Sequence, residues 1–245
     1  MDRLGPRSGF GRAVEIAFWC LARLRSGRAV HTKGTLVRAQ LRVNGESLTG
    51  AALGGPWTRP ALVRLSKSLS TPRSLPDLLG VALRVEMPQP GPDTGLLDML
   101  FASAGRHGLT HFLLAPAVSW WSRPYSTVLP YRVDGRTRFL GLQAEQTEGA
   151  PGSADPVSVE TDIRRHRRAF VLTERSLTGS LCHVGRLVLD AVPAAPEPVS
   201  FDPILNTSPR VRPIRFLSRV REWAYTGSRR ARRAPEPAGP AASLP

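Results

Sequence analysis

Short stretches in which apolar and polar residues alternate recur along the chain. In residues 35–43, TLVRAQLRV, apolar side chains occupy every second position from Val37 to Val43, and Arg38 and Arg42 fall between them. This period of two is typical of a strand with one buried face. Comparable runs predict further strands at 61–66, 80–87, 95–103, 136–145, 168–176 and 183–192.

Three other segments have helical patterns. Residues 13–22, AVEIAFWCLA, predict an amphipathic N-terminal helix, and residues 216–230 predict a C-terminal one. Residues 109–121 predict a central helix that Pro116 interrupts, because proline removes a backbone donor and clashes with the preceding turn. The charged run DIRRHRRAF, residues 162–170, indicates an exposed loop or strand edge.

Seven or eight strands with helices near both ends and in the middle indicate the α+β class. Consecutive strands lack the regular helical crossovers of a doubly wound sheet, which favours an antiparallel sheet or barrel. The expected domains are an N-terminal amphipathic helix (1–27), one folded domain (28–232) and a disordered tail rich in Pro and Ala (233–245).

The charge of the chain is strongly positive. It has 34 basic and 19 acidic residues among 245, a formal net charge of +15, and Lys33 and Lys67 are its only lysines. The first interpretation is a solvated arginine-rich surface. A basic nucleic-acid or membrane-surface binder is the alternative. We expect no specific nucleic-acid partner, because no nucleic-acid recognition signature is present.

The two cysteines, Cys20 and Cys182, give neither zinc-ligand spacing nor a disulfide framework, so we expect a reducing, cytoplasmic location. The apolar run at 13–22 is too short to span a bilayer, which needs about 20 apolar residues. No transmembrane segment is therefore expected. The amphipathic helix is expected to pack on the core, with a membrane surface as the alternative.

The segment REWAYTGSRRAR, residues 221–232, has a spacing with chemical meaning. Arg221 and Tyr225 are four residues apart and share one face of a helix. A guanidinium beside a phenol favours the phenolate, and a phenolate is an axial ligand for ferric haem. Arg232 follows on nearly the same face, where its planar fork suits a carboxylate such as a haem propionate.

Two earlier stretches accompany this segment in a fixed order. Arg28, His31, Lys33 and Gly34 form R-x-x-H-x-K-G, which leads into the first predicted strand. The sequence VRLS (63–66) then precedes PDLLGVALRV, LDMLFAS and, before the last helix, FDP. With these motifs the chain, from about residue 28 to 232, resembles the catalase-related haem proteins as a small, catalase-core-only member.

The resemblance implies a catalase-like antiparallel β-barrel of about eight strands that binds haem b. It implies Tyr225 as the ligand of the haem iron, with Arg221 keeping it a phenolate. Propionate-binding positions correspond to Arg28, Arg64 and Arg232. His31 corresponds to the distal residue that moves a proton between the two oxygens of a peroxide, and Ser66 would hydrogen-bond the other nitrogen of His31.

The sequence departs from true catalases in two places. Catalases have an asparagine in a G-N-N-x-P run after the LDMLFAS-like strand, where it orients peroxide; we assign that position to Ser103, as a catalytic candidate. Leu65 replaces the phenylalanine of V-R-F-S. We therefore expect peroxidase-like chemistry on hydrogen peroxide or an organic hydroperoxide rather than efficient dismutation.

The sequence leaves the activity and the oligomeric state open. A catalase-fold binding module that has lost activity or haem is the alternative to an enzyme. A homo-oligomer is possible, because catalase relatives commonly associate.

Overall fold

The computed structural model describes nine stretches of the chain. The predicted helices at 13–22 and 216–230, and the domain limits at residues 27 and 232, lie outside them and stay predictions. The described residues are 34–68, 71–72, 75–87, 95–106, 108–127, 130–145, 152–155, 158–194 and 199–214.

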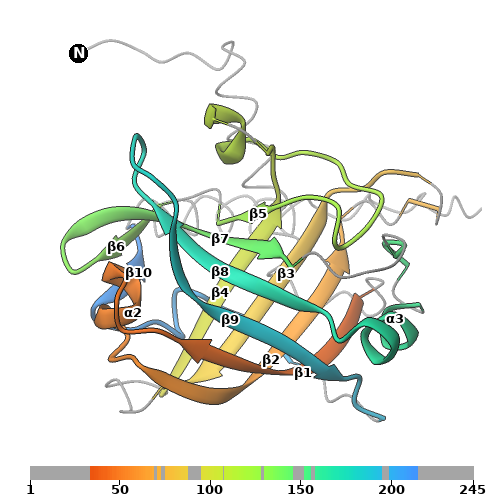
Figure 1. Ribbon diagram of the computed structural model, residues 1–245, viewed down its shortest axis with the longest axis horizontal. Coiled ribbons are helices and arrows are strands. Elements are labelled where there is room, and N and C mark those ends of the chain that lie inside the picture. Colours follow the sequence, from red (N-terminus) through yellow and green to blue (C-terminus); the bar gives the residue numbers. More distant parts are fainter. Residues whose placement is uncertain are drawn as a thin grey trace, which may run out of the picture. The chain divides into compact units, whose positions relative to one another are not determined.

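Eight antiparallel strands close into a barrel (Figure 1). Their order is β7-β5-β4-β3-β2-β1-β9-β8, and pairing between β7 and β8 completes the ring. The antiparallel barrel predicted from the sequence is thus confirmed. The ring strands are β1 (Gly34–Val43), β2 (Trp57–Lys67), β3 (Leu79–Glu86), β4 (Leu96–Ser103), β5 (Tyr125–Ser126), β7 (Arg136–Ala144), β8 (Ala169–Arg175) and β9 (Cys182–Ala191).

Two short strands extend this ring at its β7 side. β6 (Tyr131–Val133) pairs with the first residues of β7, and β10 (Val211–Pro213) pairs with β6. The β6–β7 turn places Asp134 and Gly135 at positive φ, which glycine adopts without strain. β10 thereby ties the end of the described chain to the barrel.

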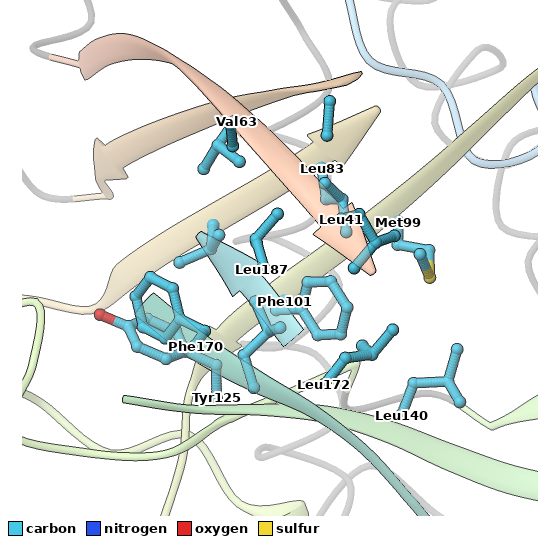
Figure 2. Packing of buried hydrophobic residues seen from close by; sticks show 14 of the residues in the cluster. Leu41, Val63, Leu83, Met99, Phe101, Tyr125, Leu140, Phe170, Leu172 and Leu187 are labelled. Atoms are coloured by element: carbon cyan, nitrogen blue, oxygen red, sulfur yellow. The ribbon is translucent and has the colours of Figure 1, made fainter. Parts of the chain in front are cut away.

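Large apolar side chains fill the barrel (Figure 2). Val37, Ala39, Leu41 and Val43 of β1 are buried while their neighbours at 38, 40 and 42 are exposed, as the alternation predicts. The other strands add residues to the same cluster. They include Val63, Leu83, Met99, Phe101, Tyr125, Leu140, Phe170, Leu172 and Leu187.

The helical predictions for the middle of the chain need correction. Residues 109–121 form only a short 3₁₀ turn, η1 (Gly108–Phe112), and then an irregular segment. The amides of Ala115 and Ala117 donate to the carbonyls of Ser103 and Asp77, so strand-like contacts use the groups that a helix would need.

The charged run is also partly helical, contrary to the predicted loop or strand edge. α3 (Val159–His166) covers its first half, and β8 begins at Ala169. Val159 and Ile163, one turn apart, give the helix a buried stripe, while Arg164 and Arg165 stay exposed. Among the described residues no helix combines the length and apolarity needed to cross a membrane.

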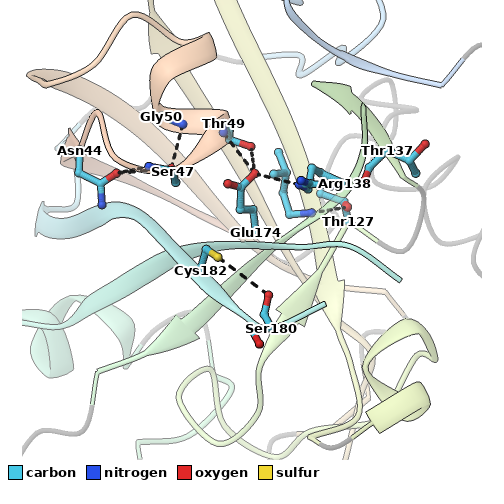
Figure 3. Close-up of polar contacts among 11 residues, drawn as sticks. Asn44, Ser47, Thr49, Gly50, Thr127, Thr137, Arg138, Glu174, Ser180 and Cys182 are labelled. Atoms are coloured by element: carbon cyan, nitrogen blue, oxygen red, sulfur yellow. Dashed lines mark hydrogen bonds and ion pairs between the residues drawn. The ribbon is translucent and has the colours of Figure 1, made fainter. Parts of the chain in front are cut away.

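A buried carboxylate closes the barrel beside α2 (Leu48–Ala52) (Figure 3). Glu174 of β8 accepts hydrogen bonds from the hydroxyl of Thr49 at 2.6 Å and from its amide at 3.2 Å. Arg138 Nε lies 3.8 Å from the same oxygen. The carboxylate therefore joins α2 to the two strands that close the ring.

Candidate functional site

The outer face of β2 carries two of the predicted site residues. Val63, Leu65 and Ala61 point into the barrel, so Arg64 and Ser66 point outward from it. Arg64 pairs with Leu36 of β1 and Ala82 of β3, and Ser66 pairs with Gly34 and Gly80. The candidate site is thus built on the outside of the β1–β4 sheet, where it is separate from the packed interior.

Gly34 brings the first motif against the second. It lies opposite Ser66, and a Cβ atom at residue 34 would stand 2.9 Å from the carbonyl oxygen of Leu65 and 3.3 Å from Arg64 Nε. Only a residue without a side chain fits this approach unchanged. The last residue of R-x-x-H-x-K-G and the polar residues of VRLS therefore meet, although about thirty residues separate them in the chain.

The hydroxyl of Ser66 is buried and has no hydrogen-bond partner among the residues that the structure describes. The residue is 4% exposed, and its Oγ makes no hydrogen bond. Buried hydroxyl groups are nearly always hydrogen-bonded, because an unsatisfied one costs about 1–3 kcal/mol. A polar group placed on this face would satisfy it.

Arg64 supplies the positive charge beside that hydroxyl. Its side chain is half-buried, and this burial lowers the pKa of the guanidinium. Arginine remains protonated even so. A partly desolvated cation interacts more strongly with an anion than an exposed one does, since water screens it less. A carboxylate ligand on the outer face would find its counter-charge here.

Ser103 lies on the opposite face of the sheet from Arg64 and Ser66. Ser103 lies two residues after Phe101, so both side chains point to the inner face of β4. It pairs with Tyr125, a core residue. Its hydroxyl donates to the carbonyl of Ala115 at 2.7 Å and accepts from the amide of Leu79 at 3.1 Å. These contacts hold the segment after η1 against the barrel, so we do not carry Ser103 forward as a site residue.

Ala102 is the residue of β4 that shares the Ser66 face. It pairs with Gly80, which in turn pairs with Ser66. Ser103, the residue assigned from the sequence, follows Ala102 directly and so lies on the other face. Asp98, Leu100 and Ala102 alternate with the core residues of the strand.

An apolar cluster adjoins Arg64 on the same face. Leu100 and Ala82 are buried there under the ring of Phe201, the first residue of FDP. Leu36 and Leu62 pack around them from β1 and β2. The outer face thus changes from small and polar residues near Ser66 to apolar residues near Phe201.

Five predicted site residues lie outside the residues that the structure describes. They are Arg28, His31, Arg221, Tyr225 and Arg232. Of the other three, Arg64 and Ser66 are brought together and Ser103 is not. Within the described stretches, no three His, Cys, Asp or Glu side chains are grouped to hold a metal ion.

Comparison with known proteins identifies a fold. No protein-family model matches the chain, and none of the curated proteins matches it. Among solved structures, catalase A from Saccharomyces cerevisiae is similar, with a TM-score of 0.57 and 12% sequence identity. The similarity covers 94% of this chain and 66% of that catalase chain. At this identity the match shows a catalase-like fold alone.

Proposed function

We propose that the protein is a haem-dependent oxidoreductase that acts on a peroxide, with Tyr225 as the ligand of the haem iron and His31 on the opposite side. One observation carries the proposal. The end of R-x-x-H-x-K-G and the polar residues of VRLS meet at Gly34 and Ser66 on the outside of a catalase-like barrel. A chance likeness of two short motifs would not require them to be adjacent.

The described residues fit a haem on two counts. Ser66 has an unpartnered buried hydroxyl, and Arg64 beside it is a partly desolvated cation. Arg64 would bind a haem propionate together with Arg28 and Arg232. The haem, when bound, supplies the redox chemistry that cleaves the O–O bond of a peroxide.

The chain between His31 and Gly34 is short enough for His31 to contact the Ser66 hydroxyl under this proposal. His31 precedes Gly34 by three residues, so its Cα lies within about 11 Å of the Gly34 Cα. A hydrogen bond donated by one imidazole N–H to the hydroxyl oxygen of Ser66 would fix the tautomer of the ring and leave the other nitrogen unprotonated. The other nitrogen then takes a proton from one peroxide oxygen and returns it to the other.

The β4 residues on this face favour an organic hydroperoxide over hydrogen peroxide. The residues that β4 presents nearest to Ser66 on this face are Ala102 and Leu100, and neither side chain donates a hydrogen bond. Neither of these two β4 side chains can therefore orient a small peroxide by donating a hydrogen bond to it. An alkyl group on the peroxide would gain binding energy from the removal of its own apolar surface from water.

Absorption spectroscopy tests the proposal. The full chain, supplied with haem, should bind it with a Soret band of the high-spin phenolate type, and Tyr225→Phe should abolish or shift that band. An organic hydroperoxide should change the spectrum of the wild type, and His31→Ala should slow this change by about 10²–10⁴-fold, the usual contribution of a general acid–base group. Haem binding with no Tyr225 dependence would contradict the ligand assignment.

The alternatives make opposite predictions. A wild-type chain that stays colourless with haem is the result expected of a barrel that serves as a binding module. Binding to nucleic acid with a steep loss of affinity in salt is expected of a basic binder. A homo-oligomer and a cytoplasmic location remain predictions from the sequence.

A further inference from the structure

Two polar atoms on the outer face of β8 are buried without hydrogen-bond partners among the described residues. Leu172 points into the barrel, so Thr173 and, two residues later, Arg175 point outward. Thr173 is 0% exposed, and neither its Oγ1 nor the buried Nε of Arg175 makes a hydrogen bond. Buried polar atoms are nearly always paired, so two orphans side by side indicate a place for a polar ligand.

Gly141 of β7 leaves space beside the Thr173 hydroxyl. It lies directly opposite Thr173 in the sheet. A Cβ atom at residue 141 would stand 2.9 Å from Thr173 Oγ1 and 3.5 Å from His111 Nε2. The carbonyl oxygen of Tyr125 is 3.0 Å from the same point. A negatively charged ligand therefore fits on the Arg175 side of Thr173, away from that carbonyl.

The short turn η1 covers this face of the sheet. His111 is 3% exposed, and the ring centre of Phe112 lies 4.3 Å from that of Phe139 of β7. The guanidinium of Arg175 lies 5.8 Å from the centre of the Phe112 ring. The surface beneath η1 thus combines a cation and a hydroxyl with two half-buried aromatic rings.

Arg175 has no carboxylate partner among the described residues. The ion pairs that they form leave it out. A half-buried guanidinium interacts strongly with an anion, because water screens it less than it screens an exposed one. An anion is therefore the ligand that this face favours.

The composition of the face favours an organic carboxylate over an inorganic anion. A carboxylate carries one charge, which one guanidinium balances, and its planar shape matches the fork of arginine. A phosphate group carries nearly two charges at neutral pH and more acceptor oxygens than these donors satisfy. The rings of Phe112 and Phe139 offer contact to an apolar group attached to the carboxylate.

We propose that the outer face of β7 and β8 beneath η1 binds a small organic carboxylate, with Arg175 as its counter-charge and Thr173 as a hydroxyl donor. The ligand reaches the Thr173 hydroxyl when η1 lifts from the sheet. In the ring of strands, β1 and β9 separate β8 from β2, which carries Arg64 and Ser66. The site is thus distinct from the proposed haem face, and the inference does not depend on it.

His111 makes this binding dependent on pH. Burial, and then the charge of Arg175, lower the pKa of His111, while a hydrogen bond to the Gly105 backbone raises it. The outward residues of β7 include no ionisable group, and Arg175 is the one on β8. A bound carboxylate offsets the repulsion between the protonated ring and Arg175, so binding should tighten as the pH falls below neutrality.

Calorimetric titration of the full chain with benzoate tests the proposal, and a parallel titration uses inorganic phosphate. Arg175→Gln should weaken benzoate binding by about 10–100-fold, the usual effect of losing hydrogen bonds to a charged group. Thr173→Val keeps the shape of the side chain and should weaken it by about 3–10-fold. Arg38→Gln and Thr58→Val, at exposed positions of β1 and β2, are the controls and should bind as the wild type does.

Thr173→Val also shows whether a loss of binding is a loss of folding. It removes an unsatisfied buried hydroxyl, so without ligand it should be as stable as the wild type or more stable. His111→Gln should abolish the tightening of benzoate binding between about pH 7.5 and pH 5.5, and His183→Gln should retain it.

The outcomes decide the site and its ligand separately. A wild-type chain that binds no benzoate, or equal affinities in the wild type and Arg175→Gln, overturns the site. Phosphate that binds as tightly as benzoate overturns the choice of an organic carboxylate. Benzoate affinity that depends on Arg175 and Thr173 but not on Arg38 or Thr58 is the result that supports the proposal.

Discussion

Gly34 of β1 lies directly opposite Ser66 of β2, and this pair joins the two N-terminal motifs of the chain on the outside of the barrel. The antiparallel pairing of β1 with β2 brings the two motifs together, although they are far apart in the sequence. Gly34 matters to the candidate site as much as the polar residues do, because a side chain at this position would contact Arg64.

Gly34→Ala should weaken haem binding more than it destabilises the barrel. The added methyl group would stand 2.9 Å from the Leu65 carbonyl oxygen and 3.3 Å from Arg64 Nε, so Arg64 must move. We expect unfolding free energy to fall by about 1–3 kcal/mol, the usual cost of overpacking. Haem titration and denaturant unfolding measure the two effects. Gln40→Ala, on the exposed side of the same strand, is the control; equal haem affinity in Gly34→Ala and wild type would contradict the prediction.

Ser66→Ala and Ser103→Ala should have opposite effects on stability. Ser66→Ala removes an unsatisfied buried hydroxyl, so the haem-free protein should be as stable as the wild type or more stable. Ser103→Ala deletes a donor to Ala115 and an acceptor for Leu79, and should cost about 1–3 kcal/mol. Denaturant midpoints measure both.

The same two variants should also differ in reaction with peroxide. Ser66→Ala should slow the reaction of the haem-loaded protein, because His31 loses the group that fixes its tautomer. Ser103→Ala should leave the rate unchanged once the protein is folded. The reverse pattern would place the functional hydroxyl on Ser103.

Stability should fall as the pH drops from neutrality, and His111 should account for part of the loss. The side chain is 3% exposed; burial, and then the charge of Arg175, lower its pKa, while a hydrogen bond to the Gly105 backbone opposes them. In the unfolded chain the pKa is about 6.5, so the unfolded state binds the proton first. The unfolding free energy is therefore not reduced by His111 above about pH 6.5. It falls as the pH drops from about 6.5 toward the lower pKa of His111 in the folded protein.

His111→Gln should therefore reduce the slope of unfolding free energy against pH in this window. His183→Gln, at an exposed position, is the control and should keep the wild-type slope. An unchanged slope in His111→Gln would mean that other groups cause the acid sensitivity.

The chain has three tyrosines, and one of them should give the phenolate signal of the folded protein. Burial raises the pKa of Tyr125 and of Tyr131 well above the ordinary phenol value, and the charge of Asp98 raises that of Tyr131 further. Both should stay protonated until the protein unfolds in alkali. A phenolate absorbance of the folded protein is therefore expected to belong to Tyr225, the third tyrosine. Tyr225→Phe should remove it, and a second tyrosine that titrates reversibly would contradict the burial of Tyr125 and Tyr131.

Strands with one exposed face were predicted closely from the sequence, and strands buried on both faces were harder to interpret. β1 alternates clearly, and its predicted start differs from the observed one by a single residue. β4 is buried from Leu97 to Ser103, because the barrel core lies on one side and Phe201 packs on the other. A strand without alternation does not reveal which face a residue occupies, so the sequence alone does not show that Ser103 lies on the face opposite to Ser66.

Short elements that depend on distant partners were missed. β5, β6 and β10 have two or three residues each, which is too short for a period to appear. α3 was not predicted, because only two of its residues, Val159 and Ile163, are buried. The charged side chains around them conceal the helical period of the apolar positions. Arg64 and Ser66 of the candidate site were found through the motif, whereas the hydrogen bond that Asp98 accepts from the amide of Asp202 joins residues about a hundred positions apart and leaves no local pattern.

The closure of the ring sets an order for folding during synthesis. β1 is the first barrel strand to emerge, and its hairpin partner β2 follows at once. Its other edge pairs Arg42 with Arg186 of β9, the last of the ring strands. That edge therefore stays open while all the intervening strands are made. Because pairing over such a separation is slow, the open edge of β1 is the place where a nascent chain is most exposed to misassociation.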